Sequence, residues 1–210
     1  MSLFITFEGG EGSGKGVQAR ALYRRLLSAG IPAILTHEPG GTPLGNVLRR
    51  WLKGTGGSGK GENEKGETDP LTELLLFNAS RAHLVSQVIR PALDGGSIVI
   101  CDRFFHSTIA YQGCGRGLSL DLIETLNDIA TQGLRPDLIV LLDIAAEQGL
   151  KRKKLRDRFE REEIAFHRRV RQCYLEMAAA EPERWLVVDG SLPKKEVQRL
   201  IWERVEQLLP

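Results

Sequence analysis

The chain has 210 residues, 41% of them hydrophobic and 27% charged, with a formal net charge of +2. This length and composition predict one well-buried domain spanning residues 1–210, and the near-balanced charge gives no support for a nucleic-acid partner. No apolar run approaches membrane-spanning length, and the N-terminal residues indicate a strand rather than a signal sequence, so we expect a cytoplasmic protein without a membrane partner.

Short apolar runs alternate with longer segments of helical periodicity. The predicted strands are residues 3–7, 33–35, 98–101, 138–142 and 185–188. The predicted helices are residues 15–29, 70–94, 119–132, 160–180 and 194–209. Continuous hydrophobicity from Leu138 to Leu142 indicates a strand that is covered on both faces. The alternation therefore predicts a three-layer α/β domain with a five-stranded parallel sheet flanked by helices.

A glycine-rich loop, here called the phosphate loop, joins the first predicted strand to the first predicted helix. Its residues are Gly9, Gly10, Glu11, Gly12, Ser13, Gly14, Lys15 and Gly16. Glycines let backbone N–H groups and the helix N-terminus converge on an anion, and Lys15 adds a mobile positive charge. This context predicts a P-loop NTPase fold that binds a nucleoside triphosphate.

The phosphate loop departs from its usual pattern at one position. Gly16 stands where the motif normally supplies a Ser or Thr hydroxyl to magnesium, and Val17 cannot supply one either. Residues 54–60 repeat the glycine-to-lysine spacing, ending at Lys60, but no apolar strand precedes them. We interpret that copy as a coincidence within a flexible insertion, residues 53–69.

Polar residues follow four of the predicted strands. They are Glu8, the segment 37–42, Asp102 with Arg103, and Asp143. Ligands of parallel α/β sheets bind beyond the carboxyl ends of the strands, so these residues are expected around one crevice. The three cysteines, at 101, 114 and 173, are an odd number without metal-ligand spacing, which predicts reduced thiols.

The segment Asp102-Arg103-Phe104-Phe105-His106-Ser107-Thr108-Ile109-Ala110-Tyr111-Gln112-Gly113 resembles the signature of thymidylate kinases. Further segments resemble that family in the same order: 7–9, 38–42, 75–77 with Arg81, 136–143 and 157–160. The resemblance implies an enzyme that phosphorylates dTMP to dTDP with ATP and Mg²⁺, as a homodimer. Alternatives are a kinase for another nucleoside monophosphate or a deoxynucleoside, and a non-catalytic nucleotide-binding regulator.

The resemblance also implies roles for residues of the dTMP site, which are Glu11, Pro39, Arg49, Phe77, Arg81, Arg103, Thr108 and Tyr111. Arg103 and Arg49 would bind the phosphate of the acceptor, dTMP. Phe77 would stack on thymine, and Arg81, four residues later on the same helical face, would hydrogen-bond a thymine carbonyl.

Glu11 would approach the sugar 3′-hydroxyl and Tyr111 the 2′ position, while Thr108 is a weaker candidate for the base. The alternatives are core packing for Phe77 and Tyr111, a surface ion pair for Arg81, and solvated side chains for Arg49 and Glu11.

A strongly basic stretch, residues 150–163, separates two predicted helical segments. A solvated charge run is the ordinary explanation, but in related kinases this region is a lid over ATP. Its candidate transition-state cations are Lys151, Arg152, Lys153, Arg156 and Arg158. Gly12, where some thymidylate kinases have arginine, indicates the bacterial type, whereas His37 replaces an arginine common in the family. Magnesium would depend on Asp102, phosphate oxygens and water.

Overall fold

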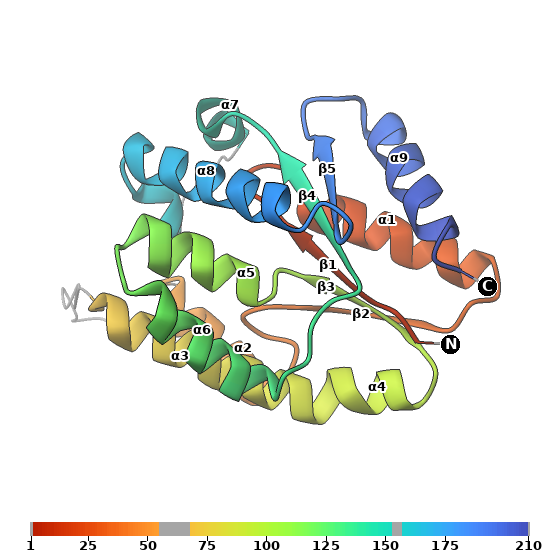
Figure 1. Cartoon of the computed structure of the whole chain (residues 1–210), viewed down its shortest axis with the longest axis horizontal. Helices are drawn as coiled ribbons and strands as arrows, with labels where there is room; N and C mark the ends of the chain where they lie inside the picture. The colour runs from red at the N-terminus through yellow and green to blue at the C-terminus, as the bar shows by residue number, and fades with distance from the viewer. Residues whose placement is uncertain (1, 55–67, 153–156, 210) are drawn as a thin grey trace, which may run out of the picture.

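The computed structural model describes residues 2–54, 68–152 and 157–209. Five strands form one parallel sheet in the order β2-β3-β1-β4-β5 (Figure 1). The strands are β1 (Phe4–Glu8), β2 (Ala33–His37), β3 (Ile98–Asp102), β4 (Leu138–Asp143) and β5 (Trp185–Asp189). Each one runs past its predicted end into a polar residue, because backbone pairing continues there, as between His37 and Asp102.

Helices cover both faces of the sheet, which confirms the expected three-layer fold (Figure 1). On one face, α1 (Lys15–Ser28) and α9 (Lys194–Glu206) bury Leu22, Leu26 and Ile201 against strand residues such as Phe7 and Val140. The opposite face is covered by α3 (Pro70–Leu84), the π-helical η1 (Val85–Ile89) and α8 (Ile164–Ala180).

The remaining helical segments connect these layers. They are α2 (Pro43–Leu52), α4 (Arg90–Asp94), α5 (Phe105–Thr108), η2 (Ile109–Gly115), α6 (Leu120–Thr131), α7 (Ala146–Lys151) and η3 (Phe159–Arg161). The predicted helix 70–94 is therefore three consecutive segments, and α2, α5, η2 and α7 were not among the predicted helices. α2 begins at a local cap, since the Thr42 hydroxyl accepts a 3.0 Å hydrogen bond from the Gly45 N–H.

The prediction of three reduced thiols is wrong for two of them. Cys114, in η2, forms a disulfide with Cys173 of α8, and their Cα atoms lie 6.2 Å apart. The two residues are separated by 59 positions in sequence, so no local spacing could indicate the pair. Cys101 on β3 is buried and free.

Within the described residues, none of the helices combines the length and apolarity that crossing a bilayer would require. The predicted flexible insertion lies almost entirely outside the described residues, as does Lys60.

Candidate active site

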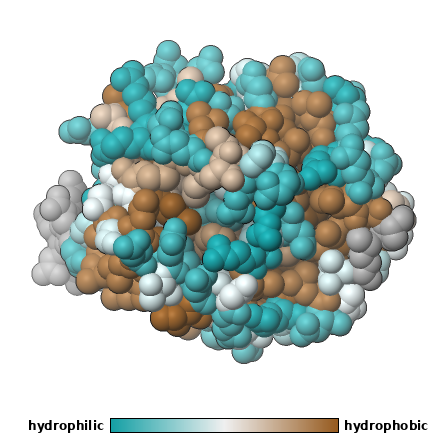
Figure 2. Space-filling model, in the orientation of Figure 1, coloured by the Kyte–Doolittle hydropathy of each residue, from teal (hydrophilic) through white to brown (hydrophobic). Residues whose placement is uncertain are grey.

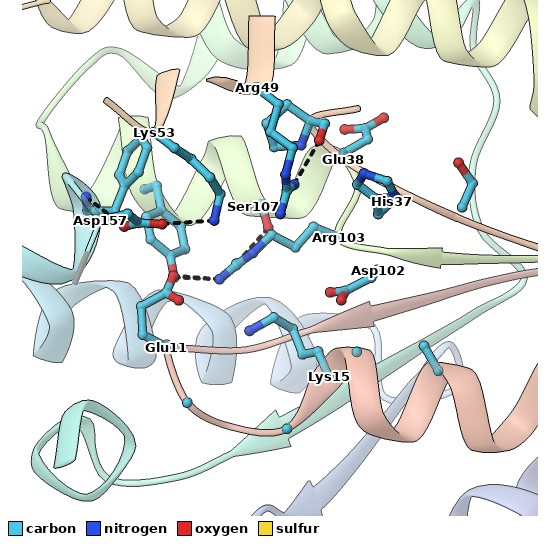
Figure 3. Close-up of a pocket in the computed structure, with 18 of the residues that line it drawn as sticks. Glu11, Lys15, His37, Glu38, Arg49, Lys53, Asp102, Arg103, Ser107 and Asp157 are labelled. Atoms are coloured by element: carbon cyan, nitrogen blue, oxygen red, sulfur yellow. Dashed lines mark hydrogen bonds and ion pairs between the residues drawn. The ribbon is translucent and has the colours of Figure 1, made fainter. Parts of the chain in front are cut away.

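A cavity of about 680 Å³ lies at the carboxyl end of the sheet, where the polar strand ends meet (Figure 3). The structure places thirteen of the predicted site residues on its wall: Glu11, Gly12, Gly14, Lys15, Gly16, Pro39, Arg49, Phe77, Asp102, Arg103, Thr108, Tyr111 and Arg152. They come from the phosphate loop, the ends of β2 and β3, α2, α3, the segment α5–η2 and the end of α7. The expected crevice exists, but two of the four polar strand ends do not line it, since Glu8 is fully buried and Asp143 accepts hydrogen bonds from Arg171 at 2.6 and 2.7 Å.

The phosphate loop wraps around the ammonium group of Lys15. Its Nζ donates to the carbonyl oxygens of Gly9 and Gly10 at 2.9 and 2.8 Å, and to Ser13 Oγ at 3.3 Å. Gly14 caps α1 with a φ of 99°, a left-handed conformation that favours glycine. Burial, together with the nearby Arg103 charge, lowers the pKa of Lys15 to about 8. An anion in the loop would favour the charged lysine.

Two glycines allow the tip of the phosphate loop to pack directly against α7. A Cβ on Gly12 would overlap the carbonyl oxygen of Gly149, and a Cβ on Gly149 would overlap the carbonyl oxygen of Glu11. Backbone thus packs directly on backbone at this point. The contact gives a physical reason why position 12 has no arginine here.

Arg103 lies at the centre of the polar network. Its backbone has a φ of 72°, which is rare outside glycine and typical of functional positions. Its Nη2 donates to Glu11 Oε1 at 2.7 Å and to the Tyr111 hydroxyl at 3.0 Å, and Tyr111 in turn donates to Glu11 at 2.7 Å. Burial alone would lower the pKa of Arg103, but Tyr111 and Glu11 hold it above its usual value.

A buried carboxylate supports Arg103 from behind. Glu8, fully buried at the end of β1, accepts hydrogen bonds from the Phe104 N–H, the Ser107 hydroxyl and the Tyr174 hydroxyl at 2.7–2.9 Å. Ser107 in turn accepts from Arg103 Nη1 at 3.1 Å. Burial raises the pKa of Glu8, against the lowering effect of Arg103. Ser107 and the strand-ending Glu8 therefore fix the position of the Arg103 guanidinium.

The wall opposite the phosphate loop is formed by α2 and α3. Arg49 Nη1 donates to the Pro39 carbonyl at 2.8 Å, and the guanidinium lies beside His37 (Figure 3). Burial and the Arg49 charge lower the pKa of His37. The Phe77 ring lies 5.9 Å from that of Phe159, leaving an aromatic surface on the cavity.

Arg81 is not among the residues that line the cavity. It is fully buried behind Thr108 and Glu38, which do line it. Its Nε donates to Glu38 Oε2 at 2.8 Å, and its Nη1 donates to Asn127 Oδ1 at 2.7 Å and Thr108 Oγ1 at 3.3 Å. Its Nη2 is buried without a partner among the described residues. The surface-ion-pair alternative is therefore wrong, since this pair is in the core.

Of the three arginines predicted in the basic stretch, the two that the structure describes occupy different places. Arg152 lies on the cavity and donates to the Gly190 carbonyl at 3.0 Å. Arg158 does not line it, because its guanidinium pairs with the buried Glu73 at 2.6 Å and with the Leu52 carbonyl at 3.1 Å. Arg156 lies outside the described residues, as does Lys153, and Lys151 is exposed at the end of α7.

Asp102 is suited to a hard cation. Its carboxylate faces the cavity near Lys15, and no hydrogen bond joins it to another described residue (Figure 3). Within the described ranges, no cluster of three ligating side chains occurs. Magnesium keeps several waters and commonly takes one or two carboxylates plus substrate phosphates, so a lone aspartate beside a phosphate loop fits it.

Sequence reasoning missed several cavity residues. Lys53 and Asp157 form a 2.8 Å ion pair at its edge, although 104 positions separate them. Arg20, one turn beyond the phosphate loop, also lines the cavity. Only Asp157 had a signal in the sequence, because it starts one of the motifs shared with the resembled family.

Known proteins resemble this chain along nearly its whole length. The family model described as "Thymidylate kinase" matches residues 7–201. A thymidylate kinase of Dehalococcoides mccartyi is 52% identical, with 100% of this chain and 98% of that protein covered; one of Thermomicrobium roseum is 47% identical, with 100% and 97% covered.

A solved structure has the same fold along its length. The crystal structure of thymidylate kinase from Ehrlichia chaffeensis superposes with a TM-score of 0.75 at 32% identity, covering 99% of each chain. Family model, relatives and structure all span the phosphate loop, the Arg103 network and the basic stretch. The chain therefore belongs to the thymidylate kinase family.

Proposed function

We propose that the protein phosphorylates dTMP to dTDP, with ATP as donor and Mg²⁺ as cofactor. The observation that supports this best is the Glu11–Arg103–Tyr111 triad, which links the phosphate loop to the end of β3 and to η2 on the wall of one cavity. A donor triphosphate on the loop and an acceptor on the wall would meet at Arg103. The whole chain, organised around one sheet, acts as a single domain in this proposal.

The donor half of the site consists of the phosphate loop and the start of α1. Backbone N–H groups of the loop and the positive end of the α1 dipole bind the phosphates. Lys15 exchanges the Gly9 and Gly10 carbonyls for phosphate oxygens. Arg152, whose Nη1 donates to the Gly190 carbonyl, adds a further cation, and Arg156 is the other candidate from the basic stretch because Arg158 pairs with Glu73.

The acceptor half is the opposite wall. Arg103 and Arg49 bind the dTMP phosphate, and Phe77 stacks on thymine beside Pro39. Arg81 acts through its unpartnered Nη2, which needs an acceptor such as a thymine carbonyl reached past Thr108.

Glu11 and Tyr111, which are hydrogen-bonded to Arg103, recognise the sugar. Glu11 accepts from the 3′-hydroxyl, and the Tyr111 ring fills the space that a 2′-hydroxyl would need. Tyr111 is 5% exposed, so packing holds its ring in place against this part of the cavity.

Phosphoryl transfer needs aligned phosphates and neutralised charge rather than a nucleophilic side chain. An oxygen of the dTMP phosphate attacks the γ-phosphorus of ATP, and the bond to the β–γ bridging oxygen breaks, releasing ADP. Lys15, Arg103 and Arg152 surround that path with positive charge. Magnesium, held by Asp102 and waters, would supply additional neutralisation of the donor phosphates.

Release of ADP with different acceptors tests the proposal. We expect kcat/KM for dTMP to exceed that for dCMP, AMP and thymidine, with dUMP as the nearest competitor. Preference for a purine or for unphosphorylated thymidine would overturn the assignment in favour of another nucleotide or deoxynucleoside kinase. Nucleotide binding without turnover would favour a regulator, the alternative that Gly16 and His37 raise.

The proposal includes a homodimer formed through α2, α3 and α6. These helices pack together and expose large apolar side chains, namely Leu44, Val47, Trp51, Leu71, Leu75, Leu120, Leu122 and Ile129. Figure 2 shows hydrophobic atoms gathered over α3 and α6. Ile129 is 68% exposed and Val47 52%, which is costly for a monomer. A second copy, presenting the same apolar face, would cover both.

Light scattering after gel filtration tests the dimer. We expect twice the chain mass for the native protein and the monomer mass for Val47→Glu, with an exposed Val187→Glu on β5 as the matched control. A native monomer, or equal behaviour of the two variants, would contradict the assembly. A cytoplasmic location, where ATP and dTMP are available, also belongs to the proposal and is testable by cell fractionation.

A further inference from the structure

Gly16 leaves a space at the start of α1 that two charged groups border. A Cβ placed on Gly16 would lie 2.8 Å from Asp102 Oδ2, closer than real Cβ contacts occur, and 3.4 and 3.8 Å from Arg20 Nη1 and Nη2. A serine or threonine at this position would therefore meet both groups. The glycine at position 16, which lacks a hydroxyl, therefore also leaves room for the Arg20 guanidinium.

Helix geometry explains why Arg20 reaches this point. Side chains on an α-helix tilt toward its N-terminus, so residue i+4 lies over residue i. Arg20 is four residues after Gly16, and its guanidinium lies back over the first turn of α1, on the wall of the nucleotide cavity. This turn ends the phosphate loop.

The Arg20 guanidinium has no competing partner among the described residues. Neither a hydrogen bond nor an ion pair joins it to any residue in the described ranges, whereas Arg49, Arg103 and Arg152 are each held by protein oxygens. The helix dipole is positive at this end of α1, so it disfavours a cation there until an anion binds. An arginine at that end of the helix can pair with an anion that binds at the phosphate loop.

We propose that Arg20 is a phosphate-binding residue of the donor site. Its guanidinium donates to a phosphate oxygen of ATP, on the side of the loop where other phosphate loops have a Ser or Thr hydroxyl. Gly16 is the residue that admits it. The inference deepens the proposed function and rests on a donor nucleotide binding at the phosphate loop. Asp102, on the other border of the same space, remains available to the cation that accompanies the phosphates.

Calorimetric titration with ADP in EDTA tests this, because a direct cation–phosphate contact does not require metal. Arg20→Ala should weaken ADP binding about tenfold, the scale of one charge-assisted contact in a solvent-exposed position. Arg24→Ala, one turn further along α1, is the matched control because Arg24 is exposed and does not line the cavity. It should stay within about twofold.

Two further measurements make the assignment specific. The affinity of Arg20→Ala for dTMP should stay within about twofold, because Arg49 and Arg103 bind the acceptor. Gly16→Ser should weaken ADP binding in the native background but have little effect in the Arg20→Ala background, since both changes disturb the same contact. A circular dichroism spectrum of each variant checks the fold.

The outcomes separate clearly. If Arg20→Ala binds ADP as tightly as the native protein, or no more weakly than Arg24→Ala does, Arg20 is a solvated surface cation and the inference is wrong. A loss confined to dTMP, or additive effects of Gly16→Ser and Arg20→Ala, would also overturn it. These titrations involve no turnover, so native protein that binds ADP but does not phosphorylate dTMP would contradict the proposed function alone.

Discussion

Replacing Arg81 by methionine should cost stability in a manner that depends on pH. Arg81 is fully buried and Glu38 nearly so, and they form a 2.8 Å ion pair. Methionine keeps much of the volume but leaves the Glu38 carboxylate without its cation. Removing one partner of a buried pair typically costs about 3–5 kcal/mol in free energy of unfolding, a large share of the 5–15 kcal/mol of an ordinary domain.

The pH dependence follows from Glu38. Burial raises its pKa to about 7, although Arg81 pulls that value down. A raised carboxyl pKa means that the folded state binds more protons than the unfolded state between about pH 4.5 and 7, so stability falls as pH rises through that window. Without Arg81 the folded pKa moves higher still. For each further unit by which the folded-state pKa of Glu38 rises, the variant loses about 1.4 kcal/mol more free energy of unfolding, measured at a pH above the new pKa. At pH 5.5 this contribution is absent, because Glu38 is protonated in both folded proteins.

Urea unfolding of native protein and Arg81→Met at pH 5.5 and pH 8 measures both effects. We expect a loss of at least about 3 kcal/mol at pH 8 and a smaller loss at pH 5.5. Arg184→Met is the matched control, because Arg184 lies 3.9 Å from Glu181 in an exposed pair that should contribute less than about 1 kcal/mol. Equal losses at the two pH values, or a loss at pH 8 no larger than the control's, would refute the reasoning.

Three further predictions concern the catalytic site; the first two use the dTMP phosphorylation assay, and the third uses titration with ADP. Lys15→Ala should nearly abolish turnover while the fold survives, because Lys15 is the buried cation of the loop, whereas Lys60→Ala should leave kcat within about threefold; comparable damage would place Lys60 in the site. Asp102→Asn should lower kcat roughly a hundredfold and change the magnesium concentration needed for half-maximal rate, and an unchanged magnesium profile would contradict its role. Gly149→Ala should weaken ADP binding by roughly tenfold or more, because its Cβ overlaps the Glu11 carbonyl, while Gln148→Ala at an exposed neighbouring position should not; equal affinities would show that the loop yields easily.

Features determined by local pattern were predictable from sequence. Continuous apolar runs located all five strands, because strands covered on both faces cannot alternate with polar residues. The phosphate loop was identified by its position between strand and helix, which also excluded the copy ending at Lys60. Its tight contact with Gly149 was not predictable, since nothing near Gly12 indicates which backbone will pack against it.

Features that depend on distant partners were not predictable. Helical spacing placed Phe77 and Arg81 on one face, yet only the packed structure shows that Phe77 reaches the cavity while Arg81 is enclosed by Glu38 and Asn127. Arg158 was expected among the free cations of the basic stretch. It instead pairs with Glu73, 85 positions away, and a buried carboxylate of that kind leaves no periodic signal in the sequence.

Arg103 and Arg81 both pair with carboxylates, but their exposure differs in a way that separates charge recognition from base recognition. The Arg103–Glu11 pair retains 17% and 14% side-chain exposure on the cavity, so a phosphate can compete for the guanidinium. The Arg81–Glu38 pair has 0% and 3%, and exchanging its carboxylate would leave a buried charge unpaired. Arg103 can therefore change partners during a catalytic cycle, whereas Arg81 can offer only its remaining Nη2. A donor that stays in one place suits a neutral carbonyl of the base, because a hydrogen bond to it fixes the position of the base without altering the charge of the site.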